Sequence, residues 1–180
     1  MIKNVGIVTL GCAKNEIDSE LMNSLLRDNN YRITNYLDEA HIIIVNTCSF
    51  ILDAKEESIE TILELSSYKV EGSCRFLILA GCLAERYSKE LLEEIPEIDG
   101  IIGAGNIKDI VNLIESLKAG IIKPERSQNI NEEYPEEVKR VNFRRTEYLQ
   151  ISEGCDNHCS YCIIPKLRGK YRSRKMDNIV

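Results

Sequence analysis

The 180-residue sequence lacks any long apolar stretch. Its longest run of this kind is the nine residues 76–84, about half of what a membrane-spanning helix requires. Tryptophan is absent, and only four prolines and ten glycines occur, which excludes collagen-like and low-complexity chains. The formal net charge is −6, so the chain also lacks the overall basic excess typical of proteins that bind nucleic acids. These features predict a soluble globular protein.

The sequence also lacks a convincing export signal. Residues 5–13 are apolar enough to form a short signal-peptide core, but only Lys3 precedes them and no small-x-small cleavage pattern follows. We therefore expect a cytoplasmic protein in which this segment is a buried strand. The cytosol disfavours structural disulfides, so grouped cysteines there indicate metal or redox chemistry. Seven cysteines are present, at positions 12, 48, 74, 82, 155, 159 and 162.

Over the first 120 residues, short apolar runs alternate with amphipathic stretches. The runs 5–10, 42–45, 76–80 and 101–102 are typical of strands buried on both faces. Apolar residues at helical spacing predict the intervening helices: Ile17, Leu21, Leu25; Ile59, Ile62, Leu63; Leu91, Leu92, Ile95; and Ile107, Ile110, Val111, Ile114, Leu117. Asp53 and Asn106 are the expected N-caps, and Gly120 is expected to end the last helix. This order predicts an α/β fold with a doubly wound, mostly parallel sheet.

The composition changes after this region. Twelve of the 25 residues in 123–147 are charged, and two prolines interrupt the segment, which indicates a linker. A strand-like run at 148–152 then leads into the last cysteines. The expected organisation is an N-terminal domain at 1–122, a charged linker at 123–147, and the start of a second domain at 148–180. The last segment is too short to close a core, so we expect the chain to stop early in that domain.

Three cysteines each follow a predicted strand: Cys12, Cys48 and Cys82. Parallel strands place their carboxyl ends at one edge of a sheet, so these three thiols are expected to meet in one crevice. Neighbouring thiolates repel one another unless a metal ion or cluster neutralises them. Gly11 and Gly81 precede two of them and allow the backbone to approach sulfur closely.

The number of ligands favours an iron–sulfur cluster over zinc. A structural zinc site requires four ligands, whereas a [4Fe–4S] cluster held by three cysteines keeps one iron open. Cys74 precedes the third strand, at the opposite end of the sheet from Cys82, and is interpreted as a small buried residue.

The remaining cysteines form a tight group, Cys155-x3-Cys159-x2-Cys162. One loop of this length can present three sulfurs to three irons of a second cluster. His158 lies within the loop and leaves a Cys3His zinc site as the alternative. Iron–sulfur protein is brown and absorbs visible light, whereas zinc protein is colourless.

Several motifs together resemble a known enzyme family. The Cys-x3-Cys-x2-Cys loop with an aromatic residue before its last cysteine resembles the signature of radical S-adenosylmethionine enzymes. The full combination is similar to that of the methylthiotransferases, and LGCAKN most resembles the branch that modifies an aspartate of ribosomal protein S12. The motifs are LGCAKN at 10–15, DSE at 18–20, NTC at 46–48, AGC at 80–82, SEGC at 152–155, IIP at 163–165 and RSR at 172–174.

The resemblance implies particular cofactors and residue roles. An auxiliary [4Fe–4S] cluster would be held by Cys12, Cys48 and Cys82, and a radical [4Fe–4S] cluster by Cys155, Cys159 and Cys162. Tyr161 would contact S-adenosyl-L-methionine, and residues 148–180 would begin a radical α/β barrel. The implied reaction installs a methylthio group on the β-carbon of an aspartate of S12, with an electron donor such as flavodoxin or ferredoxin. A fragment of this length is expected to be inactive alone.

Three other interpretations stay open at this point. Within the family, the alternative substrate is a tRNA adenosine; outside it, the alternatives are a non-catalytic iron–sulfur or zinc regulator and a flavodoxin-like binding domain. Residues 166–175 contain six basic side chains, which makes direct nucleic-acid binding conceivable. We favour a solvated loop, or cations that neutralise a cluster and a cosubstrate carboxylate, because the cysteine loop is so close. No membrane interaction is expected.

Overall fold

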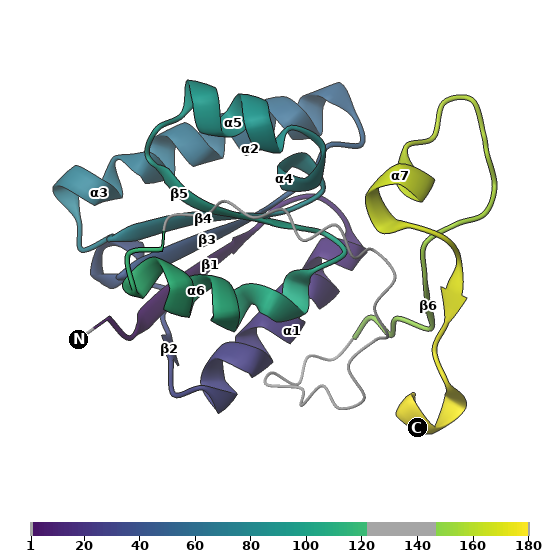
Figure 1. The fold of residues 1–180 in the computed structure, drawn as a ribbon, viewed down its shortest axis with the longest axis horizontal. Helices are drawn as coiled ribbons and strands as arrows, with labels where there is room; N and C mark the ends of the chain where they lie inside the picture. The colour runs from purple at the N-terminus through teal and green to yellow at the C-terminus, as the bar shows by residue number, and fades with distance from the viewer. Residues whose placement is uncertain (1, 122–146, 180) are drawn as a thin grey trace.

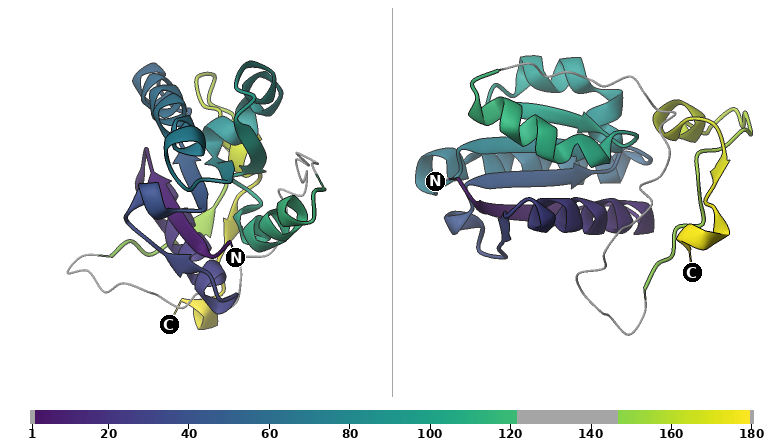
Figure 2. Two further views of the ribbon diagram at one scale, coloured as in Figure 1. Left: turned by 90° about the vertical axis from the view of Figure 1, so that its left-hand side faces the viewer. Right: turned by 60° about the horizontal axis from the view of Figure 1, so that its bottom comes forward.

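A computed structural model describes residues 2–121 and 147–179 of the chain. Its central feature is a five-stranded sheet in which every pair of neighbouring strands is parallel, in the order β2-β1-β3-β4-β5. The strands are β1 (Asn4–Thr9), β2 (Arg32–Ile33), β3 (Ile42–Thr47), β4 (Phe76–Gly81) and β5 (Ile98–Gly103). Helices cover both faces of the sheet (Figures 1 and 2). The predicted α/β fold with a doubly wound parallel sheet is confirmed.

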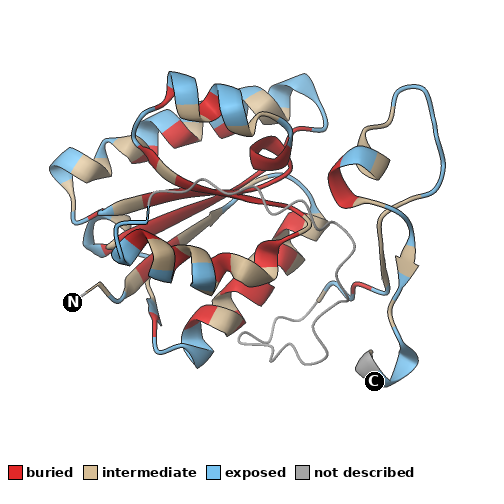
Figure 3. Cartoon of the chain, viewed as in Figure 1, coloured by how far each residue is buried: buried red, intermediate tan, exposed pale blue. Residues whose placement is uncertain are grey.

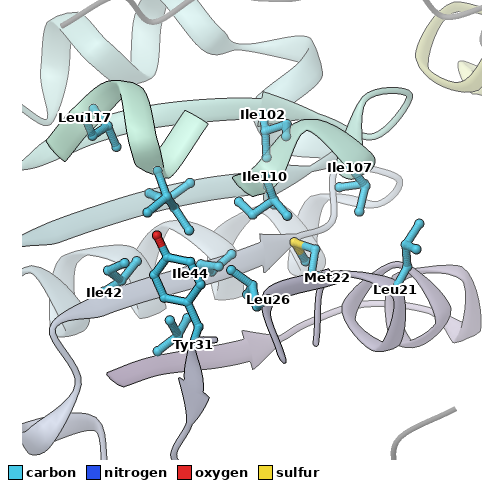
Figure 4. Packing of buried hydrophobic residues seen from close by; sticks show 14 residues of the cluster. Leu21, Met22, Leu26, Tyr31, Ile42, Ile44, Ile102, Ile107, Ile110 and Leu117 are labelled. Atoms are coloured by element: carbon cyan, nitrogen blue, oxygen red, sulfur yellow. The ribbon is translucent and has the colours of Figure 1, made fainter. Parts of the chain in front are cut away.

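Alternate residues of the strands pack on opposite faces, which gives the domain two apolar cores. On one face, Ile42 and Ile44 of β3 pack with helices α1 (Ala13–Asp28) and α6 (Ile110–Lys118), as Figure 4 shows. On the other face, Ile43 and Val45 pack with α2 (Leu52–Ser66), α4 (Cys82–Arg86) and α5 (Ser88–Glu94). All six residues of β3 are buried, so the red strands at the centre of Figure 3 are the interior of the domain.

The remaining elements are short. In the N-terminal domain they are the 3-10 turns η1 (Leu37–Glu39) and η2 (Ile107–Asp109) and the helix α3 (Tyr68–Glu71). After residue 147 they are β6 (Ser152–Glu153), α7 (Ile164–Arg168), β7 (Arg172–Ser173) and the 3-10 turn η3 (Met176–Asn178). This C-terminal segment runs beside the carboxyl edge of the sheet, with α7 next to α4 (Figures 1 and 2). Within residues 2–121 and 147–179, no helix has the length and apolar character needed to cross a membrane.

Most of the predicted elements are present, with three corrections in α2. The helix begins at Leu52 after the N-cap residue Ile51, so Asp53 lies within the first turn and is not the cap. Ile59 and Leu63, predicted to face the core, are exposed. The buried face instead carries Ser58, Ile62 and Leu65, because Ser58 forms hydrogen bonds to the backbone of Cys48 and replaces an apolar contact.

The predicted strand at 148–152 is also wrong for most of its length. Only Ser152 is in a strand, where it pairs with Ser173 of β7. Tyr148, Leu149 and Ile151 are exposed and the buried residue of the run is the polar Gln150, so the run does not form a strand with a buried apolar face. The predicted linker at 123–147 lies, except for its last residue, outside the described residues, and the boundaries of the domains stay a prediction.

The last helix of the domain agrees closely with its pattern. Ile107, Ile110, Ile114 and Leu117 are buried against α1 and the sheet, and Val111 is partly buried. The predicted N-cap Asn106 is the N-cap residue of η2, which leads directly into α6, whereas the N-cap residue of α6 itself is Asp109. Gly120 has a φ of 72° and follows the helix end, where its N–H donates to Leu117.

Candidate functional site

The carboxyl edge of the sheet carries the three cysteines that follow strands. Cys12 is the N-cap residue of α1, Cys48 follows β3, and Cys82 is the first residue of α4. All three line one cavity of about 1090 Å³. Cys48 and Cys82 are each 7% exposed, whereas Cys12 is exposed. The structure therefore brings together the three strand-end thiols, as the topology predicts.

Two glycines hold the strand ends close to one another. Gly11 has a φ of 92°, and a Cβ on it would lie 2.5 Å from Cβ and 3.0 Å from Sγ of Cys48. Gly81 has a φ of 91°, and its Cβ would lie 2.5 Å from the Thr47 carbonyl. Only glycine adopts these angles at low cost and leaves this space. A side chain at Gly11 would therefore collide with Cys48, while the approach of backbone N–H groups to sulfur stays a prediction.

A buried polar network lies beneath the cysteines and connects their segments. Asn15 on α1 donates from Nδ2 to Asn46 Oδ1 (2.9 Å) and to the Thr47 carbonyl (3.0 Å). Asn46 donates in return to the Asn15 carbonyl (2.8 Å) and to Ser19 Oγ (2.9 Å). Thr47 Oγ1 donates to the Ala80 carbonyl (2.6 Å). The start of α1 and the ends of β3 and β4, and with them the three thiols, are therefore held in one arrangement.

Asn46→Ala should lower the free energy of unfolding by about 2–3 kcal/mol, because it removes two buried hydrogen bonds and one partly buried hydrogen bond that each contribute about 1 kcal/mol. Urea unfolding followed by circular dichroism measures this change. Asn23→Ala is the matched control, because Asn23 accepts one exposed hydrogen bond from Arg27 and should change stability by less than about 0.5 kcal/mol. Equal losses in the two variants would contradict a role for the buried network.

The second cysteine group forms a loop whose base is closed by backbone hydrogen bonds. The Cys155 N–H donates to the Gly169 carbonyl (3.1 Å), and the Cys162 N–H donates to the Cys159 carbonyl (3.1 Å). Gly154 has a φ of 76°, and a Cβ there would collide with the Lys170 carbonyl. Cys162 lines the same cavity as the first three thiols, while Cys159 is exposed. The cavity is thus lined by all three thiols of the first group and, from the second group, by Cys162.

The positions of the described side chains do not support the alternative of a site for a single zinc ion. Within residues 2–121 and 147–179, no three His, Cys, Asp or Glu side chains converge closely enough to hold one metal ion. The Cys3His arrangement with His158, which the sequence left as the alternative, is therefore not preformed among these residues, and neither cysteine trio is preformed as a site for a single ion. A cluster is different, because separate thiolates bind separate irons at its corners. Three thiols spaced around a cavity are a suitable donor set for such a group. Tyr161, the predicted S-adenosylmethionine contact, lies within the second cysteine loop and is 84% exposed.

Ion pairs connect the C-terminal segment to the N-terminal domain at the same edge. Arg168 of α7 donates to Asp18 of α1 (2.8 Å) and to Glu153 (3.1 Å), and Lys14 pairs with Glu153 (3.1 Å).

Burial raises the pKa of Asp18 even though Arg168 opposes it. Burial acts on Glu153 in the same direction, but Arg168 and Lys14 prevail and hold its pKa below the usual range. Arg168 is thus buried and paired with two carboxylates of the chain rather than part of a solvated loop, and neutralisation of a cluster or a cosubstrate carboxylate by these cations stays a prediction.

The thiols themselves differ in environment. Burial raises the pKa of Cys82, Arg168 opposes this effect, and nearby Cys48 and Asp18 add to it. A metal or cluster that binds Cys82 must therefore displace a proton from a buried thiol. Cys74 lies before β4, buried in the second apolar core, where burial also raises its pKa. Its interpretation as a small buried residue is confirmed.

The Asp18–Arg168 pair was not predicted from the sequence. The two residues are 150 positions apart, so no local spacing connects them. One signal was present: Asp18 shares a helix face with Asn15 and Met22, both fully buried, and a carboxylate on a buried face requires a partner. The identity of that partner depends on the tertiary fold.

Comparisons with known proteins agree with this geometry. The model of the family described as "Uncharacterized protein family UPF0004" matches residues 4–103, which include all three strand-end cysteines. A curated protein from Desulforamulus reducens, "Ribosomal protein uS12 methylthiotransferase RimO", is 50% identical over 178 residues, covering 98% of this chain and 40% of its own length. A protein with the same name from Acetivibrio thermocellus is 45% identical, covering 100% of this chain and 41% of its own length. Another from Desulfitobacterium hafniense is 46% identical, covering 99% of this chain and 40% of its own length.

The chain thus spans about two fifths of the length of the curated relatives it matches. The similarity extends over both cysteine groups, and the resemblance to methylthiotransferases predicted from the motifs is confirmed. The chain belongs to the UPF0004 family and is similar, from end to end, to ribosomal protein uS12 methylthiotransferases.

Proposed function

We propose that this chain is the N-terminal part of a radical S-adenosylmethionine methylthiotransferase that modifies an aspartate of ribosomal protein S12 at its β-carbon. The observation that carries the proposal is the cavity at the carboxyl edge of the sheet, which is lined by all three strand-end cysteines and by Cys162. The names of the relatives support S12 as the substrate. Residues 1–122 would form the domain of the first cluster, 123–147 the linker, and 148–180 the start of the radical domain.

Two sets of thiols have separate roles in this proposal. Cys12, Cys48 and Cys82 would hold one [4Fe–4S] cluster, and Cys155, Cys159 and Cys162 the other. When bound, the two clusters would supply the electron that cleaves S-adenosylmethionine and the sulfur that replaces a hydrogen on an unactivated carbon. Acid–base chemistry cannot make that replacement. An external donor such as flavodoxin or ferredoxin would deliver that electron. Three thiolates per cluster keep one iron free for a further ligand.

The surrounding residues prepare this site by excluding water and by fixing the thiols. Leu10, Ala54 and Leu167 contribute apolar atoms to the cavity, and burial of this kind shifts the potential of a bound cluster. Gly11 admits the backbone next to Cys48, and the Asn15–Asn46 pair fixes the strand ends. Tyr161 would contact S-adenosylmethionine from the exposed side of the second loop.

The test of this function is the chemical state of S12 in cells that lack the gene. We expect mass spectrometry to find S12 without its methylthio group, and the group to return when the full-length gene is restored. Purified full-length protein should also release 5′-deoxyadenosine from S-adenosylmethionine under reducing conditions. Unchanged S12 together with a methylthio group lost from tRNA would overturn the choice of substrate. Absence of 5′-deoxyadenosine would indicate a non-catalytic regulator instead.

A further inference from the structure

Arg168 is the largest fully buried side chain in the described part of the chain, and only 2% of it is exposed. It lies in α7, six residues after Cys162, on the segment that follows the second cysteine group. The preceding residue, Leu167, packs with Cys82 and Ala104 of the N-terminal domain. The guanidinium is therefore inserted between the segment that carries the second thiol group and the element that carries Cys82.

The charges around this guanidinium are balanced and geometrically fixed. Asp18 accepts from one terminal nitrogen and Glu153 from the other, and Lys14 supplies a second cation to Glu153. Burying a guanidinium without partners costs several kcal/mol, so two carboxylates are the expected compensation. The guanidinium of Arg168 is planar, and each of its terminal nitrogens donates to a carboxylate. Its orientation is therefore fixed whether or not a cluster is bound.

This orientation places one of the nitrogens near a proposed cluster ligand. Nη2 of Arg168, which donates to Asp18, lies 3.9 Å from Sγ of Cys82. Hydrogen bonds and positive charge at a ligand sulfur stabilise the reduced, more negative state of an iron–sulfur cluster and raise its reduction potential. Asp18 acts in the opposite direction, because its negative charge lies close to the same sulfur.

We propose that Arg168 is a positioning residue that couples the two cysteine groups: it holds the segment after Cys162 against the N-terminal domain and raises the reduction potential of a cluster bound by Cys12, Cys48 and Cys82. The proposal rests on the proposed function, since it requires a cluster at the first group. A salt bridge that only stabilises the fold would satisfy the same carboxylates without altering a potential.

The test measures the reduction potential of the first cluster alone. All variants are built in the 180-residue chain with Cys155, Cys159 and Cys162 replaced by alanine, and are reconstituted anaerobically with iron and sulfide. Electron paramagnetic resonance during a redox titration gives the potential. Arg168→Met should lower the reduction potential by about 59 mV, which corresponds to a tenfold change in the equilibrium constant of a one-electron reduction. Asp18→Asn should shift it upward, because it removes a nearby negative charge and keeps the side-chain shape.

Lys170→Met is the matched control, because it removes the same charge from an exposed position two residues further along. It should leave the potential unchanged. If Arg168→Met does not fold, Arg168→Gln, which also removes the charge but keeps a side chain that can donate hydrogen bonds, should lower the potential in the same direction. Iron binding with equal potentials in the parent and the Arg168 variant would overturn the role of Arg168 and leave the proposed function intact. Failure of the parent to bind about four irons would instead contradict the cluster site itself.

Discussion

Cys82→Ala is expected to remove about four of roughly eight irons per chain after reconstitution, because each [4Fe–4S] cluster contains four. Cys82 is 7% exposed and faces the cavity from the first turn of α4, so its replacement leaves one corner of the first cluster without a thiolate. Colorimetric iron and sulfide analysis measures the loss, and visible absorbance should fall to about half. The iron held by the second cysteine group should remain.

Cys74→Ala provides a matched control for this experiment. Cys74 is also a buried free cysteine, at 5% exposed, but it precedes β4 and contacts the Phe76 carbonyl rather than the cavity. Its replacement removes the same sulfur atom from the core and should leave the iron content unchanged. Equal iron loss in the two variants would indicate that the loss comes from disturbed packing of the core rather than from a missing cluster ligand. Full iron content in Cys82→Ala would exclude the first cysteine group as a cluster site.

Gly81→Ala should lower the free energy of unfolding by about 2–5 kcal/mol, because two costs add. A left-handed backbone costs a non-glycine residue about 1–2 kcal/mol, and overpacking costs about 1–3 kcal/mol. The Gly81 φ is 91°, and the new Cβ would lie 2.5 Å from both Asn46 Oδ1 and the Thr47 carbonyl. Urea unfolding measures the change, and the melting temperature should fall by about 2–4 °C per kcal/mol.

Gly120→Ala separates the two costs. Gly120 has a φ of 72°, but a Cβ built on it meets no heavy atom of the described residues within 4 Å. This variant should therefore show the backbone cost alone, about 1–2 kcal/mol. A loss in Gly81→Ala no larger than that in Gly120→Ala would mean that the strand ends have room to move apart. The cysteines would then not be held as tightly as the contacts indicate.

β1, β3 and β4 could be predicted because each contains a continuous apolar run, whereas only residues 101–102 of β5 were predicted, since Asp99 and Gly100 interrupt its apolar residues. β3 and β4 are buried on both faces, which leaves a strong signal in the sequence. β2 could not be predicted, because it contains only Arg32 and Ile33 and is defined by pairing with β1. The α4 helix was also not predicted, since its first three residues, 82–84, directly continue the apolar run of β4.

The cysteine groups of the candidate site were predictable, but the residues that support them were not. A cysteine after a strand marks an edge of a parallel sheet, so sequence order alone predicts that Cys12, Cys48 and Cys82 meet. The contact between Asn15 and Asn46 spans 31 residues and that between Asp18 and Arg168 spans 150. Such pairs depend on how α1 lies on the sheet and where α7 docks, and no local periodicity encodes either.

The polar end of β3 has a consequence for folding. Ile42, Ile43, Ile44 and Val45 are apolar on both faces, so hydrophobicity alone would tolerate a slip of one residue between β3 and its neighbours. Such a slip would displace Cys48 by about 3.3 Å along the strand and leave the amide of Asn46 without its partners. The hydrogen bonds of Asn46 and Thr47 therefore select the correct alignment of the central strand. The same hydrogen bonds therefore align the central strand and place Cys48 at the cavity.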